Sequence, residues 1–299
     1  MRKIAFAILL QLLIANSLTV SPIYGETLDG RGTNSLTVLT WNTARMGHFA
    51  KPEKNEVLQY LVAQDADVLC LQEVDVYKDS KYLTLPDVKA TLSKKYPYSY
   101  LDFSTYNKRH QFGTMVWSKY PLINKQSIHY ETRGNLSNRC DIVVGKDTIR
   151  LFNNHLESYN FTSADLADAD SLHNYEGFLA TFKRLKAKWQ RAIPLRNQPA
   201  QVVRAEIDAS PYPVIVTGDF NSIALSYAYF LLSSGLHDAW RTVHPWRWGA
   251  TCEHRGVGLR IDYILSSQEL LPTQCDIIDT SGSDHKPLVA TLEWETTKK

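Results

Sequence analysis

The sequence predicts an α/β fold in which two packed, mostly antiparallel sheets are flanked by helices. The chain has 299 residues and is 44% hydrophobic, which supplies the core of one large domain. Many short apolar segments have the length of strands, whereas few helical segments separate them. Because no repeat or low-complexity tract interrupts residues 26–299, we predict a single domain there.

The N-terminus has the pattern of a secretory signal peptide. Two basic residues precede the apolar run Ile4–Ala15, and the small residues Ser17 and Gly25 are candidate cleavage points. We therefore expect residues 1–25 to be a signal peptide and the protein to be exported, to the periplasm or the extracellular space. The apolar run is shorter than the roughly 20 residues of a membrane span, and an uncleaved anchor is the alternative.

The net charge bears on the partners of the mature protein. The full chain has 33 Lys and Arg against 31 Asp and Glu, and the leader contains Arg2 and Lys3 but no acid. Removing the leader leaves 31 residues of each sign. A neutral chain has no general attraction for polyanions, so a phosphate-bearing partner must be held by a local patch or a metal ion.

The predicted strands and helices alternate irregularly along the chain. A helix is expected over residues 52–64, "PEKNEVLQYLVAQ", because Pro52 suits a helix N-terminus and apolar residues follow at helical spacing. Two further helices are expected at Asn174–Ile193 and Gln198–Ala209. The strand candidates are residues 35–42, 66–74, 112–118, 140–144, 148–155, 214–221, 260–266 and 287–294.

The segment "YPVIVTGDFNSIA" shows how these strands end. Its apolar run Val214–Val216 is typical of a strand buried on both faces, and Asp219 and Asn221 follow at its C-terminal tip. Side chains two residues apart on a strand point the same way, so these two could share one site. A simple turn is the alternative, since Asp, Asn and Gly all favour turns.

The same pattern of an apolar strand followed by a polar side chain recurs across the chain. Each polar residue alone has an ordinary structural explanation as a cap, a turn residue or a hydrogen-bonded histidine. The recurrence favours a common site. The set comprises Asn42, Glu73, His155, Asp219 with Asn221, Asp262, and Asp284 with His285.

Carboxylate and amide oxygens suit Mg²⁺, with Mn²⁺ as an alternative. The sequence has no histidine or thiol cluster with zinc spacing, no Gly-x-x-x-x-Gly-Lys loop and no Gly-x-Ser-x-Gly motif. A metal-binding carboxylate, an Asp that activates water and imidazoles that meet charge on phosphorus together indicate a phosphoester hydrolase.

Six motifs resemble those of the endonuclease/exonuclease/phosphatase superfamily, whose members are similar to pancreatic deoxyribonuclease. The motifs are "TWNTARM", "LCLQEV", "FNNHLES", "TGDFNS", "RIDYIL" and "SGSDHKPL", in the family's order and with roughly its spacing. The resemblance covers nearly all of the mature chain. It implies a four-layered α/β sandwich whose site lies at the strand tips.

The resemblance also implies a role for each residue. Asn42, Glu73 and Asp284 would lie on the metal side, with Glu73 as the principal Mg²⁺ ligand. Asp219 would activate the attacking water, and Asn221 would hold water or phosphate beside it.

Two histidines complete the implied machinery. His155 would contact a phosphate oxygen, and Asp262 would fix the tautomer of the second histidine, His285. Family members often supply an Arg or Tyr to the phosphate, and Arg139 is the candidate here.

The substrate class is the least determined feature. A nucleic acid or a general phosphodiester is the first expectation, and a phospholipid such as sphingomyelin is the second. The basic segment "FLATFKRLKAKWQRAI" (residues 178–193) suits a phosphate backbone, although a surface helix is its ordinary explanation. The loop "AWRTVHPWRWGATC" (residues 239–252) suits base stacking, a membrane interface or core packing. The motifs of the chain disfavour one subfamily, the inositol polyphosphate 5-phosphatases, because "VTGDFNSIA" and "LRIDYIL" lack that subfamily's tryptophans and arginines.

A non-catalytic, partner-binding member of the fold is a third alternative, disfavoured because the proposed acids and both histidines are present. We expect a monomer with no obligate protein partner. Cys70 should be a buried thiol, whereas Cys252 and Cys275 flank one strand and could pair in an oxidising compartment.

Overall fold

The computed structural model describes residues 33–47, 52–128, 130, 135–157, 198–224, 226–254 and 256–295. The expected signal peptide and the expected helix Asn174–Ile193, with its basic segment, lie outside these ranges.

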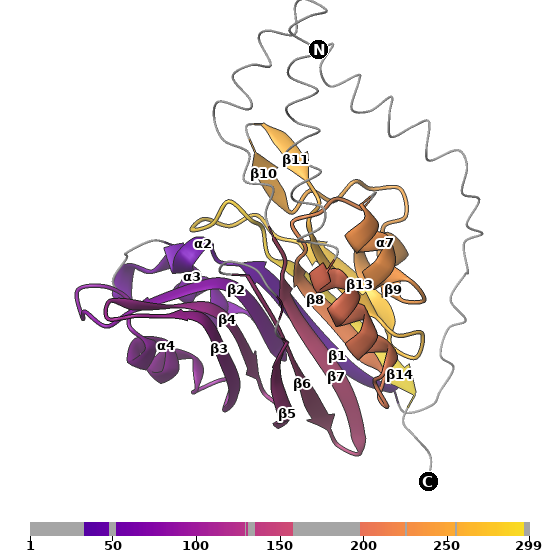
Figure 1. Cartoon of the computed structure of the whole chain (residues 1–299), viewed down its shortest axis with the longest axis horizontal. Coiled ribbons are helices and arrows are strands. Elements are labelled where there is room, and N and C mark those ends of the chain that lie inside the picture. Colours follow the sequence, from indigo (N-terminus) through magenta and orange to yellow (C-terminus); the bar gives the residue numbers. More distant parts are fainter. Residues whose placement is uncertain are drawn as a thin grey trace, which may run out of the picture. The chain divides into compact units, whose positions relative to one another are not determined.

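Two six-stranded mixed sheets form the centre of the fold (Figure 1). The first has the order β13-β14-β1-β2-β4-β3 and the second has the order β5-β6-β7-β8-β12-β9. Each contains one parallel pair, β1 with β2 and β7 with β8, and is otherwise antiparallel. The first sheet comprises β1 (Thr33–Asn42), β2 (Val68–Tyr77), β3 (Tyr98–Tyr106), β4 (His110–Ser118), β13 (Leu271–Ile277) and β14 (Leu288–Glu295). The second comprises β5 (Leu122–Ile128), β6 (Leu136–Val144), β7 (Asp147–His155), β8 (Val214–Asp219), β9 (His237–Asp238) and β12 (Asp262–Ser266).

A separate hairpin, β10 (Cys252–His254) with β11 (Val257–Leu259), precedes β12. The described helical segments are α2 (Ala44–Gly47), the 3₁₀ turn Pro52–Lys54, α3 (Glu56–Ala63), α4 (Leu85–Leu92), residues 198–208, α7 (Tyr227–Ser233) and α8 (Ala239–Val243).

Alternating side chains assign the two faces of each sheet. In β1, Val38 joins the cluster between the sheets, whereas its neighbour Leu39 packs outward against α3 and α4. In β7, Leu151 faces inward, and Phe152 packs outward against helix 198–208 and α7. Since both faces of the central strands are covered, these strands have few polar residues. The layers are helices, sheet, sheet and helices, which confirms the predicted fold class.

The predicted helix over residues 52–64 is two shorter elements. The side chain of Asn55 accepts a hydrogen bond from the Leu58 N–H and so caps α3, which therefore begins at Glu56. The helix predicted at Gln198–Ala209 is present over residues 198–208.

All four cysteines are buried free thiols, so the expected burial of Cys70 is confirmed and Cys252 and Cys275 are unpaired in this structure. Within the described residues, no helix has both the length and the apolar character needed to cross a membrane.

Buried amides connect the two sheets beneath the strand tips. The side-chain N–H groups of Gln72 in β2 donate to Oδ1 of Asn153 in β7 at 2.7 Å and to Oγ1 of Thr40 at 3.0 Å. Asn153 in turn donates to the carbonyl oxygens of Leu71 and Met115. These amide groups are buried, so water cannot replace a lost partner. Breaking one of these hydrogen bonds would leave a buried polar group unsatisfied, which is costly.

We expect Gln72→Ala to lower the free energy of unfolding by about 1–3 kcal/mol, because Asn153 and Thr40 then lose a buried donor. Urea unfolding measures the change. Gln274→Ala removes an exposed glutamine from β13 and is the matched control, which should stay within about 0.5 kcal/mol of the parent. Equal effects of the two substitutions would contradict the structural role of Gln72.

Candidate active site

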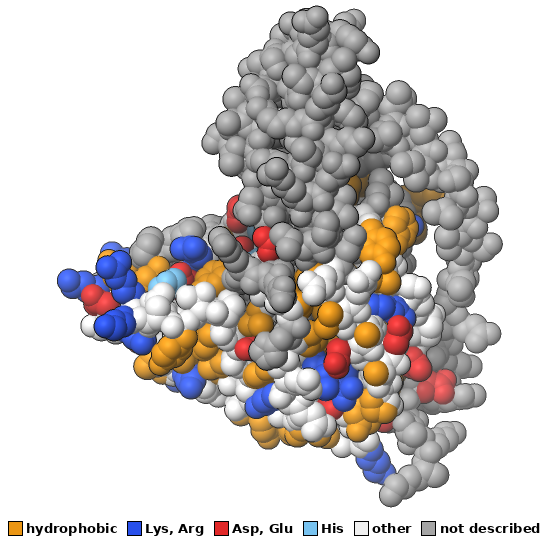
Figure 2. Space-filling view, in the orientation of Figure 1, with side chains coloured by type: hydrophobic (Ala, Val, Ile, Leu, Met, Phe, Trp, Pro, Cys, Tyr) orange, Lys and Arg blue, Asp and Glu red, His pale blue; other side chains and the backbone are white. Residues whose placement is uncertain are grey.

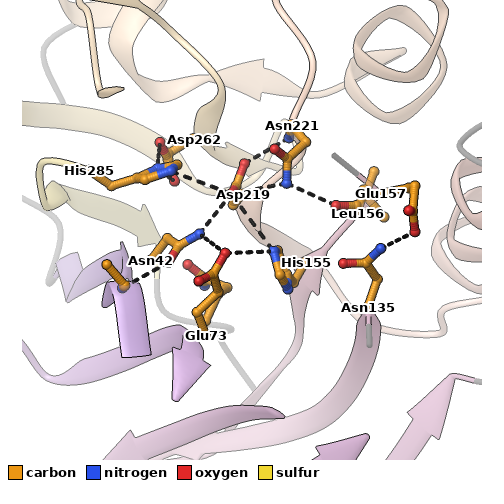
Figure 3. A network of polar contacts seen from close by, with 12 residues as sticks. Asn42, Glu73, Asn135, His155, Leu156, Glu157, Asp219, Asn221, Asp262 and His285 are labelled. Carbon is orange, nitrogen blue, oxygen red and sulfur yellow. Dashed lines mark hydrogen bonds and ion pairs between the residues drawn. The ribbon is translucent and has the colours of Figure 1, made fainter. Parts of the chain in front are cut away.

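The register of three neighbouring strands brings the predicted site residues of the second sheet together. His155 at the end of β7 is paired with Asp219 at the end of β8, and Asp219 is paired with Asp262 at the start of β12. Asn42 ends β1 of the first sheet, beside β2. Figure 3 shows these side chains converging on one another from both sheets.

Asn42 joins carboxylates that belong to different sheets. Its Nδ2 donates to Oε1 of Glu73 at 3.1 Å and to Oδ2 of Asp219 at 2.9 Å, while its Oδ1 accepts from the Ala44 N–H. The side chain is 1% exposed. An aspartate here would add a third negative charge, whereas a neutral amide donor holds the two carboxylates together.

A β-bulge directs Glu73 into the site. The register between β2 and β4 shifts between Leu71 and Val74, and Glu73 has a φ of 49°, in the left-handed region. Bulges next to active sites re-aim side chains, and non-glycine residues keep such a conformation only where the surroundings impose it. The Glu73 side chain therefore leaves the pleat of β2 and reaches His155, whose Nε2 lies 3.4 Å from Oε1.

The environment keeps Glu73 ionised. Burial by itself raises the pKa of this carboxyl, but the hydrogen bond and charge of His155, with the amide of Asn42, outweigh burial and lower the pKa to about 2. A carboxylate that stays charged is suited to bind a cation.

Asp219 lies at the tip of β8, next to a glycine that the packing requires. Gly218 has a φ of 125°, and a Cβ there would lie 1.9 Å from the carbonyl oxygen of Asn154 in β7. Only glycine allows this approach of the two strands. The glycine in "TGDFN" therefore sets the position of the acid that follows it.

Asn221 reaches the site through a turn instead of strand alternation. β8 ends at Asp219, and Asn221 has a φ of 48°. Its backbone N–H donates to Oδ1 of Asp219 at 2.7 Å and its Nδ2 to Oδ2 at 3.1 Å. The prediction that both side chains share one site agrees with this geometry, but the expected period-two strand does not extend to Asn221.

Asp219 has the opposite protonation tendency from Glu73. Burial raises its pKa to about 6, with Asp262 acting in the same direction, although His285, His155 and Asn42 oppose the shift. A carboxylate with a raised pKa is a better proton acceptor than an exposed aspartate.

Two buried histidines flank Asp219. Nε2 of His155 lies 4.0 Å and Nε2 of His285 lies 3.8 Å from its Oδ2. Nδ1 of His285 lies 2.9 Å from Oδ2 of Asp262, so that carboxylate orients the ring. Burial lowers the pKa of both imidazoles, but the neighbouring carboxylates outweigh it and raise each pKa above its ordinary value. Both rings are thereby favoured as proton donors.

A cavity of about 560 Å³ opens beside this cluster. Glu73, Asp284 and His285 line it, so Asp284 shares this cavity with Glu73, and its place on the metal side stays a prediction. Arg45, which the sequence analysis did not single out, also lines the cavity. Its guanidinium lies 3.8 Å from Asp75 and above the ring of Phe112.

The structure does not bring Arg139 to this cluster. Its side chain projects from the outer face of β6, where Nε lies 2.9 Å from the Glu206 carboxylate and Nη2 donates to Gln126. Its strand partner Phe152 packs on the same outer face. A phosphate contact by Arg139 stays a prediction without support from this geometry.

The donor set fits a divalent cation. Among the described residues, two groups of three place their ligand atoms within 4.8 Å of one another: Asp219, Asp262 and His285, and Cys252, Asp284 and His285. Glu73 belongs to neither group, but it shares the cavity with Asp284. The oxygen donors Glu73 and Asp284 suit a hard cation such as Mg²⁺ or Mn²⁺.

Solved structures share this fold. An endonuclease/exonuclease/phosphatase from Beutenbergia cavernae aligns with a TM-score of 0.62 at 16% identity, over 87% of this chain and 72% of that one. One from Bacteroides vulgatus aligns with a TM-score of 0.61 at 17% identity, over 88% and 100%. ANGEL2, described as a 2′,3′-cyclic phosphatase in complex with adenosine-2′,3′-vanadate, aligns with a TM-score of 0.58 at 17% identity, over 90% and 100%.

No curated protein sequence matches the chain. The model of the Endonuclease/Exonuclease/phosphatase family matches residues 39–285, which include every site residue predicted from the sequence. The chain therefore belongs to the endonuclease/exonuclease/phosphatase family, and it is a divalent-metal-dependent phosphoester hydrolase.

Proposed function

We propose that this chain is an exported, Mg²⁺-dependent phosphodiesterase that hydrolyses nucleic acid. The observation that carries the reaction is the buried Asp219, held by two amides and flanked by two imidazoles at the edge of an acidic cavity. Export rests on the N-terminal sequence pattern, and mass spectrometry of the mature protein from the producing cell tests it.

In the proposed mechanism, each side chain has one task. Asp219 takes a proton from the attacking water, and Asn221 holds that carboxylate in place. His155 and His285 donate hydrogen bonds to the phosphate oxygens, where negative charge develops, and Asp262 keeps the His285 ring oriented. Glu73, Asn42 and Asp284 are proposed to hold the metal ion, which when bound supplies Lewis-acid stabilisation of the phosphate.

A basic rim favours a polyanionic substrate. It consists of Arg45, Lys78, Lys108 and Arg109, all exposed, near the turn that joins β3 to β4. The Lys78 N–H donates to the carbonyl oxygen of Arg109, so the two segments touch. Figure 2 shows basic side chains gathered at the left-hand end of this face, with acidic side chains among them. Since Arg45 lies in both the rim and the cavity lining, this patch can guide a phosphate backbone to the site.

One observation favours a lipid phosphodiester as the second candidate. Trp246 is 95% exposed and Trp248 is 48% exposed, whereas Trp240 of the same segment is packed in the core. Exposed tryptophan suits a membrane interface as well as a nucleic-acid base.

The two carboxylates should respond differently to removal of their charge. Glu73→Gln should weaken Mg²⁺ binding, and high Mg²⁺ should restore part of the turnover, because a ligand becomes a neutral amide. Asp219→Asn should lower kcat by a factor of roughly 10² or more with little change in metal affinity, since it removes the general base. Mg²⁺ titrations of both variants on bis-p-nitrophenyl phosphate check this, and equal rescue would reverse the assignment.

Asp262 should act through His285 alone. His285→Ala and Asp262→Ala should combine less than additively in kcat/KM, with a coupling of at least about 0.5 kcal/mol, because either substitution removes the same oriented imidazole. A control cycle of Asp262→Ala with Lys94→Gln should be additive. Additive losses in the main cycle would show that the two residues work separately.

The basic rim should distinguish the two substrate classes. If the rim contacts a nucleic-acid backbone, Lys78→Gln with Arg109→Gln should flatten the salt dependence of binding by about one unit of slope per lost phosphate contact. Lys89→Gln with Lys94→Gln, around the end of α4, is the charge-matched control. Hydrolysis of the small diester should be unaffected in both. Unchanged DNA and RNA binding, together with loss of vesicle binding in Trp246→Ala, would instead support the lipid candidate.

A further inference from the structure

We propose that Cys252, Asp284 and His285 form a binding site for a soft divalent cation, of the zinc class, that overlaps the catalytic site. The sulfur, a carboxylate oxygen and a ring nitrogen of these residues all lie within 4.8 Å of one another. Cys252 and His285 are buried, at 7% exposure each, whereas Asp284 is exposed. Asp284 and His285 line the cavity, so a cation that enters it meets a carboxylate and an imidazole, with the thiol of Cys252 within 4.8 Å of both.

The backbone fixes this arrangement before any ion binds. Cys252 and His285 form an isolated β-bridge. Hydrogen bonds lie on both sides of it, from the Lys286 N–H to the Thr251 carbonyl oxygen and from the Glu253 N–H to the Asp284 carbonyl oxygen. The Trp41 indole N–H also donates to the His285 carbonyl oxygen from β1, at 2.9 Å. Since the ligands come from segments that are already paired, little ordering is needed to close the site.

The donor set separates this site from the proposed magnesium side. Thiolate and imidazole are ligands of Zn²⁺ and related ions, whereas Mg²⁺ prefers oxygen donors alone. The sulfur of Cys252 lies within 4.8 Å of a ring nitrogen of His285. On binding, the thiol releases its proton to solvent and the sulfur donates an electron pair to the cation, with no change of oxidation state.

Occupation of this site should inhibit the enzyme, a consequence that rests on the proposed function. Nδ1 of His285 faces Asp262 and Nε2 faces Asp219. Whichever nitrogen binds the cation loses a contact with one of these carboxylates. Asp284 is also withdrawn from the magnesium side. A soft cation thus removes a proposed catalytic imidazole and a proposed metal ligand together.

Titration of the purified mature chain with Co²⁺, followed by displacement with Zn²⁺, tests the site without any substrate. The parent should develop a thiolate-to-cobalt charge-transfer band that Cys252→Ser abolishes. Cys275→Ser is the matched control, since it removes another buried thiol, and it should keep the band. Zn²⁺ affinity should fall at least about tenfold in Cys252→Ser, because substitutions even around metal ligands cost ~10–100-fold. The same band in the parent and in Cys252→Ser, or equal Zn²⁺ affinity, would overturn the proposal.

Far-ultraviolet circular dichroism shows whether Cys252→Ser folds. A second variant tests the site if it does not. Asp284→Asn changes an exposed carboxylate, so it should fold, keep the charge-transfer band and bind Co²⁺ more weakly. Unchanged Co²⁺ affinity in Asp284→Asn would contradict the three-ligand site.

Inhibition is measured separately, as the Zn²⁺ concentration that halves each variant's own Mg²⁺-supported rate on bis-p-nitrophenyl phosphate. This concentration should rise at least about tenfold in Cys252→Ser. Binding without inhibition would reject the overlap with catalysis. If the parent hydrolyses no phosphodiester, the proposed function fails, and the cobalt and zinc titrations still decide the site.

Discussion

The side-chain amide of Asn42 donates to two carboxylates that belong to different sheets, and the rest of the site depends on this contact. Glu73 comes from β2 and Asp219 from β8, so the distance between them is set by how the two sheets pack. Gln72 precedes Glu73 in β2 and makes a second buried contact between the sheets, because its side-chain amide donates a hydrogen bond to Asn153. Polar bonds of this kind have a narrow range of length and direction, so they fix the position of one sheet against the other more tightly than apolar packing does.

Neighbouring groups give the two carboxylates different properties, although they share one donor. Glu73 leaves the pleat at a bulge and meets His155, which keeps it charged, whereas Asp219 is enclosed at the strand tip and lies near Asp262. A carboxyl that stays ionised and a carboxyl with a raised pKa therefore stand side by side. Where the surroundings shift the pKa values of neighbouring groups in opposite directions, they usually decide which group acts as the acid and which as the base.

The surroundings of the cavity bear on the proposed nucleic-acid substrate. Arg45 is held by Asp75 at the cavity mouth, and the basic rim extends from it along the turn between β3 and β4. The full chain has a net charge of only +2, so attraction for a polyanion has to be local. The thiol of Cys252 lies within 4.8 Å of ligand atoms of Asp284 and His285, and it is the softest donor of this group.

The sequence alone determined the type of fold and most of the site. Apolar strands that end in Asn42, His155 and Asp219 can be recognised locally, because a strand covered on both faces must be apolar and its polar residues then stand out at its tip. The sequence predicts Glu73 at such a tip too, but β2 continues to Tyr77 and a bulge inside the strand directs Glu73 into the site. The edge strands β3, β5 and β13 could not be recognised in this way. Their outer side chains contact water, and a segment such as "LINKQSI" consequently has no clear pattern.

Only the tertiary structure decided which polar residues meet. Arg139 has the right chemistry for phosphate, but it lies on the outer face of β6, where its guanidinium forms an ion pair with Glu206. Asn221 reaches Asp219 through a left-handed turn that no alternation predicts. Cys252 and His285 are far apart in the chain and become neighbours through a single bridge. Local sequence fixes the chemistry of each side chain and its nearest backbone, whereas contacts across sheets depend on register and face, which are set by packing of the whole chain.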